Sequence, residues 1–402
     1  MDRDMDDSFK RGIRKVKFRF ELYNRNGDFK KDLSNILSFR ISHNFFAQVK
    51  TTARISMEED NDIDFMNDIV RPYIMISSPS EPFVHDEKDV TFLHMTHPIE
   101  TERITEGEYS EWEEYPLGAF FLSSPTRRDE KSLVIRDIEA YDISLILSED
   151  KITERYSISK GTNYVLEVRR LLKNAGIERY HIEAPDVVTT RRDMEYEPGT
   201  SLLTVINDML GQIGNTPIYM DNRGMLRSDR YVNPSDRPPT VHYDDCTCSL
   251  VLVGAEEELD VFNVPNVFTV AISNPDEPPI VRTVINDDPS NPLSTVRRGR
   301  RIVDFRTVED MASEDSLERY VMRIANEANT QYGSIKFRTP LMLGHWYGDI
   351  VKLTYKPLDI EGTFLESGWE MDLKVGGEMT HTLRRVVNFS PERLVRGSGS
   401  DD

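Results

Sequence analysis

The middle of the chain carries one helical pattern twice. Apolar residues recur with helical period in residues 161–176 and again in residues 199–214. Each segment opens with Gly-Thr, whose hydroxyl can cap free N–H groups, and closes with a glycine suited to a left-handed C′ position. Two copies are too few for a solenoid, so we predict a pair of helices packed stripe to stripe.

The residues before this helical centre alternate between apolar and polar, which is typical of half-buried strands. The strands that we predict here cover residues 14–24, 36–41, 47–57, 71–77, 115–124 and 132–142. Residues 79–114 are mostly polar and form a long excursion between strands. The pattern predicts an antiparallel barrel or sandwich over residues 1–148.

The second half of the chain repeats the change from helix to strand. An α/β region, residues 149–238, contains the helix pair and a hairpin and ends in a proline-rich linker. The strands predicted beyond it cover residues 248–253, 266–272, 335–339, 349–355, 369–374 and 379–389. We assign residues 239–274 and 332–389 to a second β domain and residues 275–331 to an inserted small domain with one helix, capped by Ser313. Residues 390–402 lack apolar content and are predicted to be a disordered tail.

Composition limits the classes of function. The 402 residues are enough for several cores, and no apolar run reaches the roughly 18 residues that span a bilayer, so no membrane insertion is expected. The acidic residues 1–7 do not resemble a signal peptide. The formal net charge of −20 argues against a sequence-reading nucleic-acid binder, because phosphate attraction dominates such binding. It is compatible with a protein past which a polyanion slides.

The sequence contains no recognisable catalytic or nucleotide-binding motif, and we predict no catalytic, cofactor-binding or metal-binding residues. His94 and His97 have a spacing that could suit a metal, but on a strand these positions point to opposite faces. Cys246 and Cys248 lack a second pair or a nearby histidine, so zinc is not expected, and such thiols fit a reducing compartment. The acidic runs at 111–114 and 256–258 are interpreted as solvated faces.

One dense basic cluster stands out in this acidic chain. It consists of Arg297, Arg298, Arg300 and Arg301. One interpretation makes it a contact for an acidic partner or for the lumen of an assembly. The other pairs it with neighbouring carboxylates across a loop or a subunit interface.

Short motifs occur in a characteristic order along residues 14–389. They lie at residues 115–122, 196–210, 218–224, 260–266, 286–295 and 299–300. Together they resemble phage tail hub proteins, the baseplate hub or tail-associated proteins related to the hub of contractile-tailed phages. The resemblance implies a mixed β and α+β fold with two tail-tube-like antiparallel β-barrel domains and α/β peripheral domains.

The resemblance also implies a structural, non-enzymatic role in the virion. A homotrimer would form a ring at the tail tip or baseplate, assembled in the host cytoplasm, that joins the hexameric tube or distal tail protein to a tip, spike or fibre protein. Its channel would enclose the tape measure protein and later phage DNA, which would pass without specific binding. An acidic lumen suits this passage.

Two alternatives remain open. Aromatic residues such as Trp112, Trp346 and Trp369 fit a receptor- or glycan-binding tail protein, although buried strand aromatics are the commoner explanation. The abundant carboxylates fit a cell-wall hydrolase, which we rank below it. Many relatives continue into an enzymatic or receptor-binding extension, whereas this chain stops soon after Phe389, so we expect a separate tip, fibre or lysin protein to dock onto it.

Overall fold

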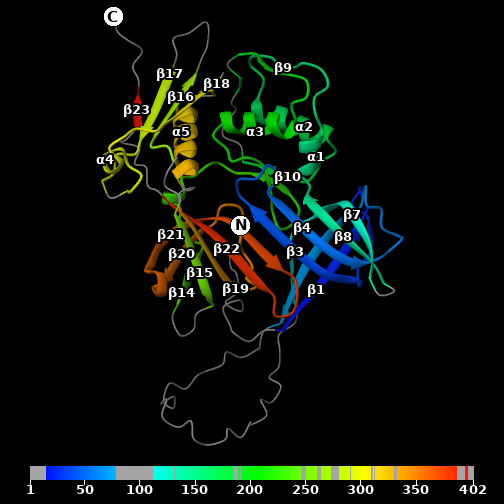
Figure 1. Ribbon diagram of the computed structural model, residues 1–402. Coiled ribbons are helices and arrows are strands. Elements are labelled where there is room, and N and C mark those ends of the chain that lie inside the picture. The colour runs from blue at the N-terminus through cyan, green and yellow to red at the C-terminus, as the bar shows by residue number, and fades with distance from the viewer. Residues whose placement is uncertain are drawn as a thin grey trace, which may run out of the picture.

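The fold is known from a computed structural model. It describes residues 15–77, 112–130, 133–183, 189–190, 192–245, 250–259, 264–272, 280–289, 291–308, 311, 313–329, 333–386 and 394–396. The excursion up to residue 111, the histidines and cysteines discussed above for metal binding, and residues 260–263 lie outside the described residues. The described part is mostly β-sheet with few helices, so the mixed, β-rich class is confirmed (Figure 1).

The strands before the helical centre largely follow the prediction, except that residues 29–32 form a strand that was not predicted and residues 115–124 divide between two strands. This first β set comprises β1 (Lys15–Tyr23), β2 (Phe29–Asp32), β3 (Ile36–Asn44), β4 (Thr51–Glu58), β5 (Ile69–Ser77), β6 (Glu113–Pro116), β7 (Phe120–Glu130) and β8 (Leu133–Asp142). On β4, every second residue from Thr51 to Met57 is buried. The hairpin predicted in this part of the chain is the β7–β8 pair.

A second β set follows the helical centre. It comprises β14 (Val241–Asp244), β15 (Leu252–Leu259), β19 (Gly333–Pro340), β20 (Ile350–Tyr355), β21 (Ile360–Asp372) and β22 (Glu378–Arg385). A 3-10 turn, η3 (Lys356–Leu358), joins β20 to β21. Neighbouring strands pair antiparallel, apart from β14, which runs parallel to β20.

The two β sets belong to one sheet. Strands β3 and β21 pair antiparallel from Gly368 opposite Asn44 to Asp372 opposite Arg40, and we call these five pairs the seam. Through the seam the described strands form a single open path from β15 to β2. The prediction of two separate closed barrels is therefore not confirmed. The sequence could not reveal the seam, because its strands are more than 300 residues apart.

Aromatic rings from three parts of the chain stack together beside the seam. The ring of Tyr347 lies parallel to Phe45 at 4.5 Å between centroids and to Tyr219 at 4.4 Å. Phe45 follows β3, Tyr347 precedes β20, and Tyr219 belongs to the hairpin in the middle of the chain. The ammonium group of Lys50 lies 5.2 Å from the Tyr347 ring, a cation–π arrangement. Three parts of the chain thus share one packed cluster.

The middle region contains the predicted helix pair. Its elements are α1 (Leu145–Glu149), β9 (Tyr156–Ile158), α2 (Tyr164–Asn174), β10 (Tyr180–Ile182), β11 (Met194–Tyr196), α3 (Leu202–Gln212), β12 (Tyr219–Met220), β13 (Leu226–Ser228) and η2 (Pro234–Asp236). Helices α2 and α3 pack together, and the hydroxyl of Tyr164 donates to Gln212 across them. Gly176 and Gly214 have the left-handed φ that was predicted.

The helix caps differ from the prediction by one residue. The side chains of Asn163 and Ser201, not the preceding threonines, accept hydrogen bonds from the first turns. The hydroxyls of Thr162 and Thr200 instead donate to the carbonyls of Ser159 and Glu197. Thr, Asn and Ser can all cap a helix, so the sequence pattern alone did not select between neighbours.

A small lobe completes the molecule. It contains β16 (Val267–Ile272), β17 (Ile280–Ile285), α4 (Thr295–Arg298), β18 (Val303–Val308), α5 (Glu314–Asn329) and β23 (Leu394–Arg396). Helix α5 packs on β16 and β17, and residues such as Phe268 and Leu317 form a separate core. Ser313 caps α5 as predicted, by accepting from the N–H of Ser316.

Two assignments around the small lobe were wrong. Residues 266–272, which we placed with the second β set, pair with β17 and β18 instead. Residues 394–396, which lie in the predicted disordered tail, form β23 against β17. Residues 275–331 also contain the short helix α4 in addition to α5. In both corrected segments, long-range backbone pairing decides the structure, and local composition does not report it.

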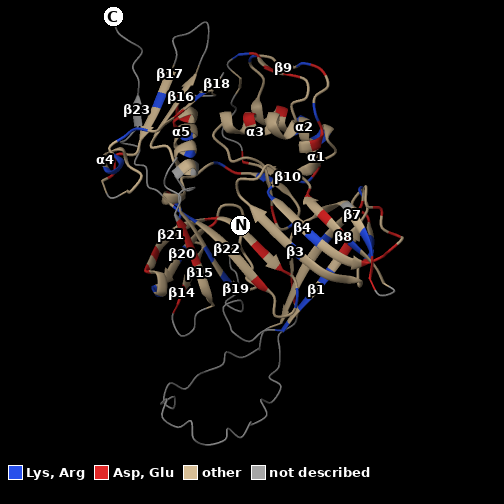
Figure 2. Cartoon of the chain, in the orientation of Figure 1, with Lys and Arg blue, Asp and Glu red and all other residues tan. Residues whose placement is uncertain are grey.

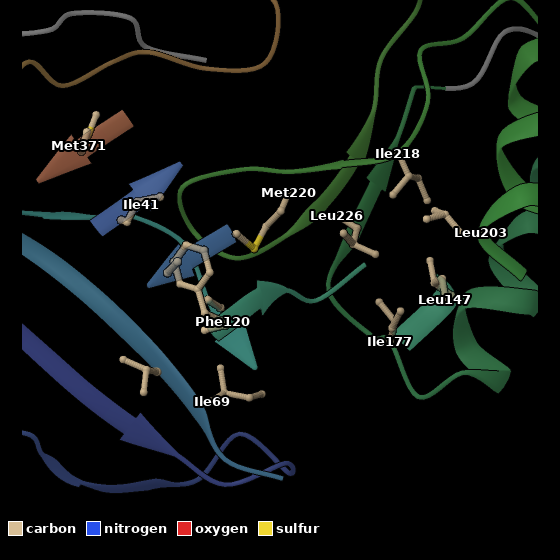
Figure 3. Packing of buried hydrophobic residues seen from close by; sticks show 14 of the residues in the cluster. Ile41, Ile69, Phe120, Leu147, Ile177, Leu203, Ile218, Met220, Leu226 and Met371 are labelled. Carbon is tan, nitrogen blue, oxygen red and sulfur yellow. The ribbon is translucent and has the colours of Figure 1, made fainter. Parts of the chain in front are cut away.

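Two of the motifs behind the family resemblance meet in space. The turn of the β12–β13 hairpin lies against residues 117–120, and the N–H of Gly118 donates to Asn222 at 2.7 Å. Figure 3 shows Met220 between Phe120 of the sheet and Leu226 of the hairpin, so one hydrophobic core runs from the strands into the helical region. We call the contact between the turn of the β12–β13 hairpin and residues 117–120 the junction. None of the described helices is long and apolar enough to cross a membrane.

The junction leaves no room for a side chain at Gly224. A Cβ there would lie 2.7 Å from that of Ala119, whereas Gly376, with the same φ of 69°, has nothing within 4 Å. We expect Gly224→Ala to lower the free energy of unfolding by about 2 to 4 kcal/mol and Gly376→Ala by only about 1 kcal/mol. Urea unfolding of both variants measures this, and equal losses would contradict the tight junction.

Acidification should weaken the seam through His43. This buried histidine stacks on Trp369, and burial together with the charge of Lys50 lowers its pKa to about 4 from the usual 6.5, although Glu366 opposes the shift. Between these values the unfolded chain binds a proton that the folded chain does not. Stability is therefore lost as pH falls from 6.5 to 4, by about 3 kcal/mol.

The variant His43→Gln should lose correspondingly less stability over this pH range than the native chain. His181 is exposed, and the control variant His181→Gln should leave the pH dependence of stability unchanged. Chemical unfolding at several pH values gives the comparison. A pH dependence unaltered in His43→Gln would refute the assignment.

Candidate functional site

The arginine cluster is held in a defined conformation on the small lobe. Ser294 caps the short helix α4 by accepting from the N–H of Arg297, and Gly299 ends it with a left-handed φ of 61°. Arg297, Arg300 and Arg301 are exposed, and Figure 2 shows basic residues, in blue, at α4. The guanidinium of Arg298 donates to the carbonyl of Val264 at 2.6 Å. The exposed arginines of the cluster are therefore held at the surface by an ordered turn.

Asn266 fixes the chain beneath these arginines. This fully buried side chain donates to the carbonyls of Leu293 and Arg300 and accepts from the N–H of Ile302. Burial, together with the charge of Arg300, lowers the pKa of Arg298. Within the described part of the chain, no carboxylate pairs with Arg297 or Arg301.

The second β set encloses a cluster that the sequence analysis missed. His345 precedes β20, Glu366 lies on β21 and His381 on β22, and all three side chains are fully buried. The carboxylate of Glu366 contacts both Nδ1 atoms, at 2.6 Å for His345 and 2.7 Å for His381. We call these three residues the buried cluster.

Hydrogen bonds also fix the outer edges of both imidazole rings. The Nε2 atom of His345 lies 2.8 Å from the hydroxyl of Tyr243, and that of His381 lies 2.9 Å from the hydroxyl of Thr339. These contacts join the strands β14, β19, β21 and β22 around one carboxylate. The rings cannot rotate without losing these bonds.

Burial and charge act in opposite directions inside this cluster. Burial would raise the pKa of Glu366, but the charge and hydrogen bonds of the two histidines lower it to about 2. Burial would lower the pKa of His345, but Glu366 raises it, whereas burial and the charge of His345 keep the pKa of His381 below its usual value. The carboxylate therefore stays ionised, and positive charge is shared close to it.

The only trace of this cluster in the sequence is the position of His381. His381 lies on the same face of β22 as Met379 and Leu383, which are both buried. The alternation of side chains along a strand therefore puts its imidazole at a core position. His345 and Glu366 lie at no recognisable spacing from it. We predicted no metal ligands because we considered only motifs of neighbouring residues. The three residues of the buried cluster come together through pairing between strands.

A cleft separates the middle region from the small lobe. It has a volume of about 620 Å³ and lies between β11 and α3 on one side and β18 and α5 on the other. Polar side chains from both sides line it, among them Arg192, Asp208 and Arg323. Its volume is in the range of ligand sites, but polar groups within the chain already pair along its wall, as the Tyr196 hydroxyl does with Asp208 at 2.7 Å.

Below this cleft, α5 is attached to the end of α3. The guanidinium of Arg323 donates to the carbonyl of Asn215 at 2.8 Å, and Gly214 lies against Arg319 so closely that a Cβ would approach its Nε to 2.7 Å. The carboxyl end of a helix attracts cations. Arginines of the small lobe thus complete the end of α3.

The three tryptophans considered for receptor binding are all partly buried. Trp369 belongs to the seam, where it stacks on His43, and Trp112 lies under the ammonium group of Lys17 at 4.2 Å. Packing within the chain accounts for these two rings. Neither is an exposed platform for a sugar.

No family model matches the sequence, and no curated protein does. Solved structures do resemble the fold. A tail protein from Neisseria meningitidis has a TM-score of 0.62 at 11% identity, covering 92% of this chain and 96% of its own. The 43 kDa tail protein of prophage MuSo2 from Shewanella oneidensis has a TM-score of 0.57 at 10% identity, covering 92% and 98%. This chain has the fold of phage tail proteins.

The likeness extends to one further solved structure. A chain of the PdpA–VgrG complex of Francisella has a TM-score of 0.50 at 9% identity, and the match covers 97% of this chain but only 60% of that one. The resemblance to the tail hub family that the short motifs suggested is thus confirmed for the fold. At such low identities, function requires a separate argument.

The attachment of α5 to α3 can be tested at one residue. Arg323→Met keeps the apolar stem but removes the bond to Asn215, and we expect the amides of α5 and the end of α3 to exchange about fivefold faster, equivalent to about 1 kcal/mol. Arg169→Met, an exposed position on α2, is the control. Hydrogen-exchange mass spectrometry measures both, and unchanged exchange in Arg323→Met would show that the lobe is held by other contacts.

Proposed function

We propose that this chain is a structural hub protein in the tail of a bacteriophage or phage-like particle. The observation that carries the proposal is the likeness to two tail proteins over at least 92% of each chain. The fully buried carboxylate Glu366 is held by two histidines and offers no open catalytic cleft. A scaffold without enzymatic activity fits these features better than a hydrolase.

In this proposal three copies form a ring. The first and second β sets act as two tube-like modules, and three chains place six modules around a channel, which matches a hexameric tube. Residues 149–238 and the small lobe are peripheral. The seam supports this arrangement, because it holds two modules of one chain side by side as one sheet. Strands β2 and β15, at the ends of the described path, have edges that neighbouring copies could cover.

The partners follow from this geometry. One side of the ring meets the tube or distal tail protein, the other a tip, spike or fibre protein, and the channel contains the tape measure and then DNA. The net charge of −20 supports passage of DNA without retention. The arginine cluster, Arg297, Arg298, Arg300 and Arg301, is proposed as a contact for an acidic partner surface. The location is the virion tail tip, with assembly in the host cytoplasm.

Assembly of the purified chain tests the ring. Native mass spectrometry and electron microscopy should show trimers with six similar densities around a hole, alone or together with the adjoining tail proteins. A chain that stays monomeric at high concentration, even in their presence, would refute the hub.

The arginine cluster is tested by reversing two charges. In the double variant Arg300→Glu and Arg301→Glu we expect binding of the partner or neighbouring copy to weaken at least tenfold, because like charges then meet in the interface. The matched control is the double variant Arg25→Glu and Arg230→Glu, at exposed positions outside the cluster. Analytical ultracentrifugation of the variants with the tail partners gives the comparison, and equal binding by both would remove the arginines from the interface.

A further inference from the structure

The buried cluster has the donor set of a metal site. We propose that His345, Glu366 and His381 bind one divalent transition-metal ion, of the zinc class, in the core of the second β set. Their ligand atoms all lie within 4.8 Å of one another. Two imidazole nitrogens and one carboxylate are a set of three protein ligands that zinc binds. This inference does not depend on the tail function.

The hydrogen bonds around His381 determine which of its atoms faces the carboxylate. The Thr339 hydroxyl donates its hydrogen to the carbonyl of Pro340 at 2.7 Å, so its oxygen must accept from the Nε2–H of His381. In a neutral imidazole the hydrogen is then on Nε2, and Nδ1 carries a lone pair. That lone pair points at the Oε1 atom of Glu366, 2.7 Å away. Two lone pairs at this distance repel unless a positive charge lies between them.

The ring of His345 has the same orientation relative to Glu366. Its Nδ1 atom faces Glu366 and its Nε2 atom faces Tyr243. Histidines that bind metals commonly use one ring nitrogen as ligand and donate the other N–H to a polar neighbour, which fixes the ring. Tyr243 and Thr339 provide such neighbours for the two rings.

Buried carboxylates make this region favourable for a positively charged ligand. Asp349 is also buried, and its charge acts on His345, while its Oδ2 atom accepts from the N–H of Trp346. With Glu366 this makes two carboxylates in one buried region. A divalent ion held by the three side chains would place positive charge beside these carboxylates. Uncompensated buried charge is costly.

Binding requires the three side chains to move apart. Zinc lies about 2.0 to 2.2 Å from nitrogen and oxygen ligands. Two ligands of a tetrahedral zinc then lie about 3.3 to 3.6 Å apart. The Nδ1 and carboxylate atoms, now 2.6 and 2.7 Å apart, would therefore separate by about 0.6 to 1 Å. Because all three side chains are fully buried, the ion would be acquired during folding and would exchange slowly. It would tie the segment before β20 to β21, the strand that makes the seam.

The native full-length chain, free of any histidine tag, provides the first test. Elemental analysis of protein purified without added metal should give about one zinc or related ion per chain. After unfolding and refolding in chelator, ZnCl2 should raise the melting temperature, and CoCl2 should give the visible absorption of four-coordinate cobalt. Less than one-tenth of an ion per chain, together with no response to ZnCl2 or CoCl2, would overturn the proposal and leave a proton as the bridging charge.

Variants distinguish this cluster from adventitious surface binding. Glu366→Gln keeps the shape but removes the charged ligand, and we expect at least a tenfold loss of Zn²⁺ affinity. The control His181→Gln with His242→Gln removes two exposed histidines and should bind as the native chain does. Loss of binding in the control, or native binding in Glu366→Gln, would contradict the assignment. If Glu366→Gln does not fold, the metal content and cobalt spectrum of the native chain still decide the question.

Discussion

The seam between β3 and β21 is the constraint on which the rest of the structure depends. It joins strands from the two ends of the sequence into one sheet, and it requires Gly368, where a Cβ would lie 2.8 Å from the carbonyl oxygen of His43. Side chains reinforce it, since Arg40 pairs with Glu370 at 3.2 Å and Trp369 stacks on His43. A long-range contact of this kind has a high entropic cost to form, so it needs support from both faces.

The buried hydrophobic residues that support the fold form two cores. The large core is continuous from both β sets into the helix pair, through the junction at Met220 and the aromatic stack on Tyr347. The small lobe has its own core and reaches the main body through the arginines of α5. The β sets and middle region thus behave as one packed unit, whereas the small lobe depends on fewer contacts. Its arginine cluster lies on the part best able to adapt to a partner.

Much of the local structure could be predicted from the sequence, because it depends on periodicity and turn residues. The strands of the first β set, the helix pair and the Ser313 cap all follow from patterns within a few residues. The seam, the partners of β16 and the strand β23 could not be predicted, since each depends on backbone pairing between distant segments. The arginine cluster was visible as a run of charge. The buried cluster was not, because pairing of β21 with β22 and the fold of the segment before β20 create it.

The account's central claim is that the two β sets form one rigid body. Hydrogen exchange of the native chain measures this most directly, at the backbone amides of residues 40–44 and 368–372. We predict that these amides are protected as strongly as those of β4 paired with β8 inside the first β set, because the seam opens only when the whole sheet does. Fast exchange at the seam, with slow exchange inside each β set, would contradict the account and make the two sets independent.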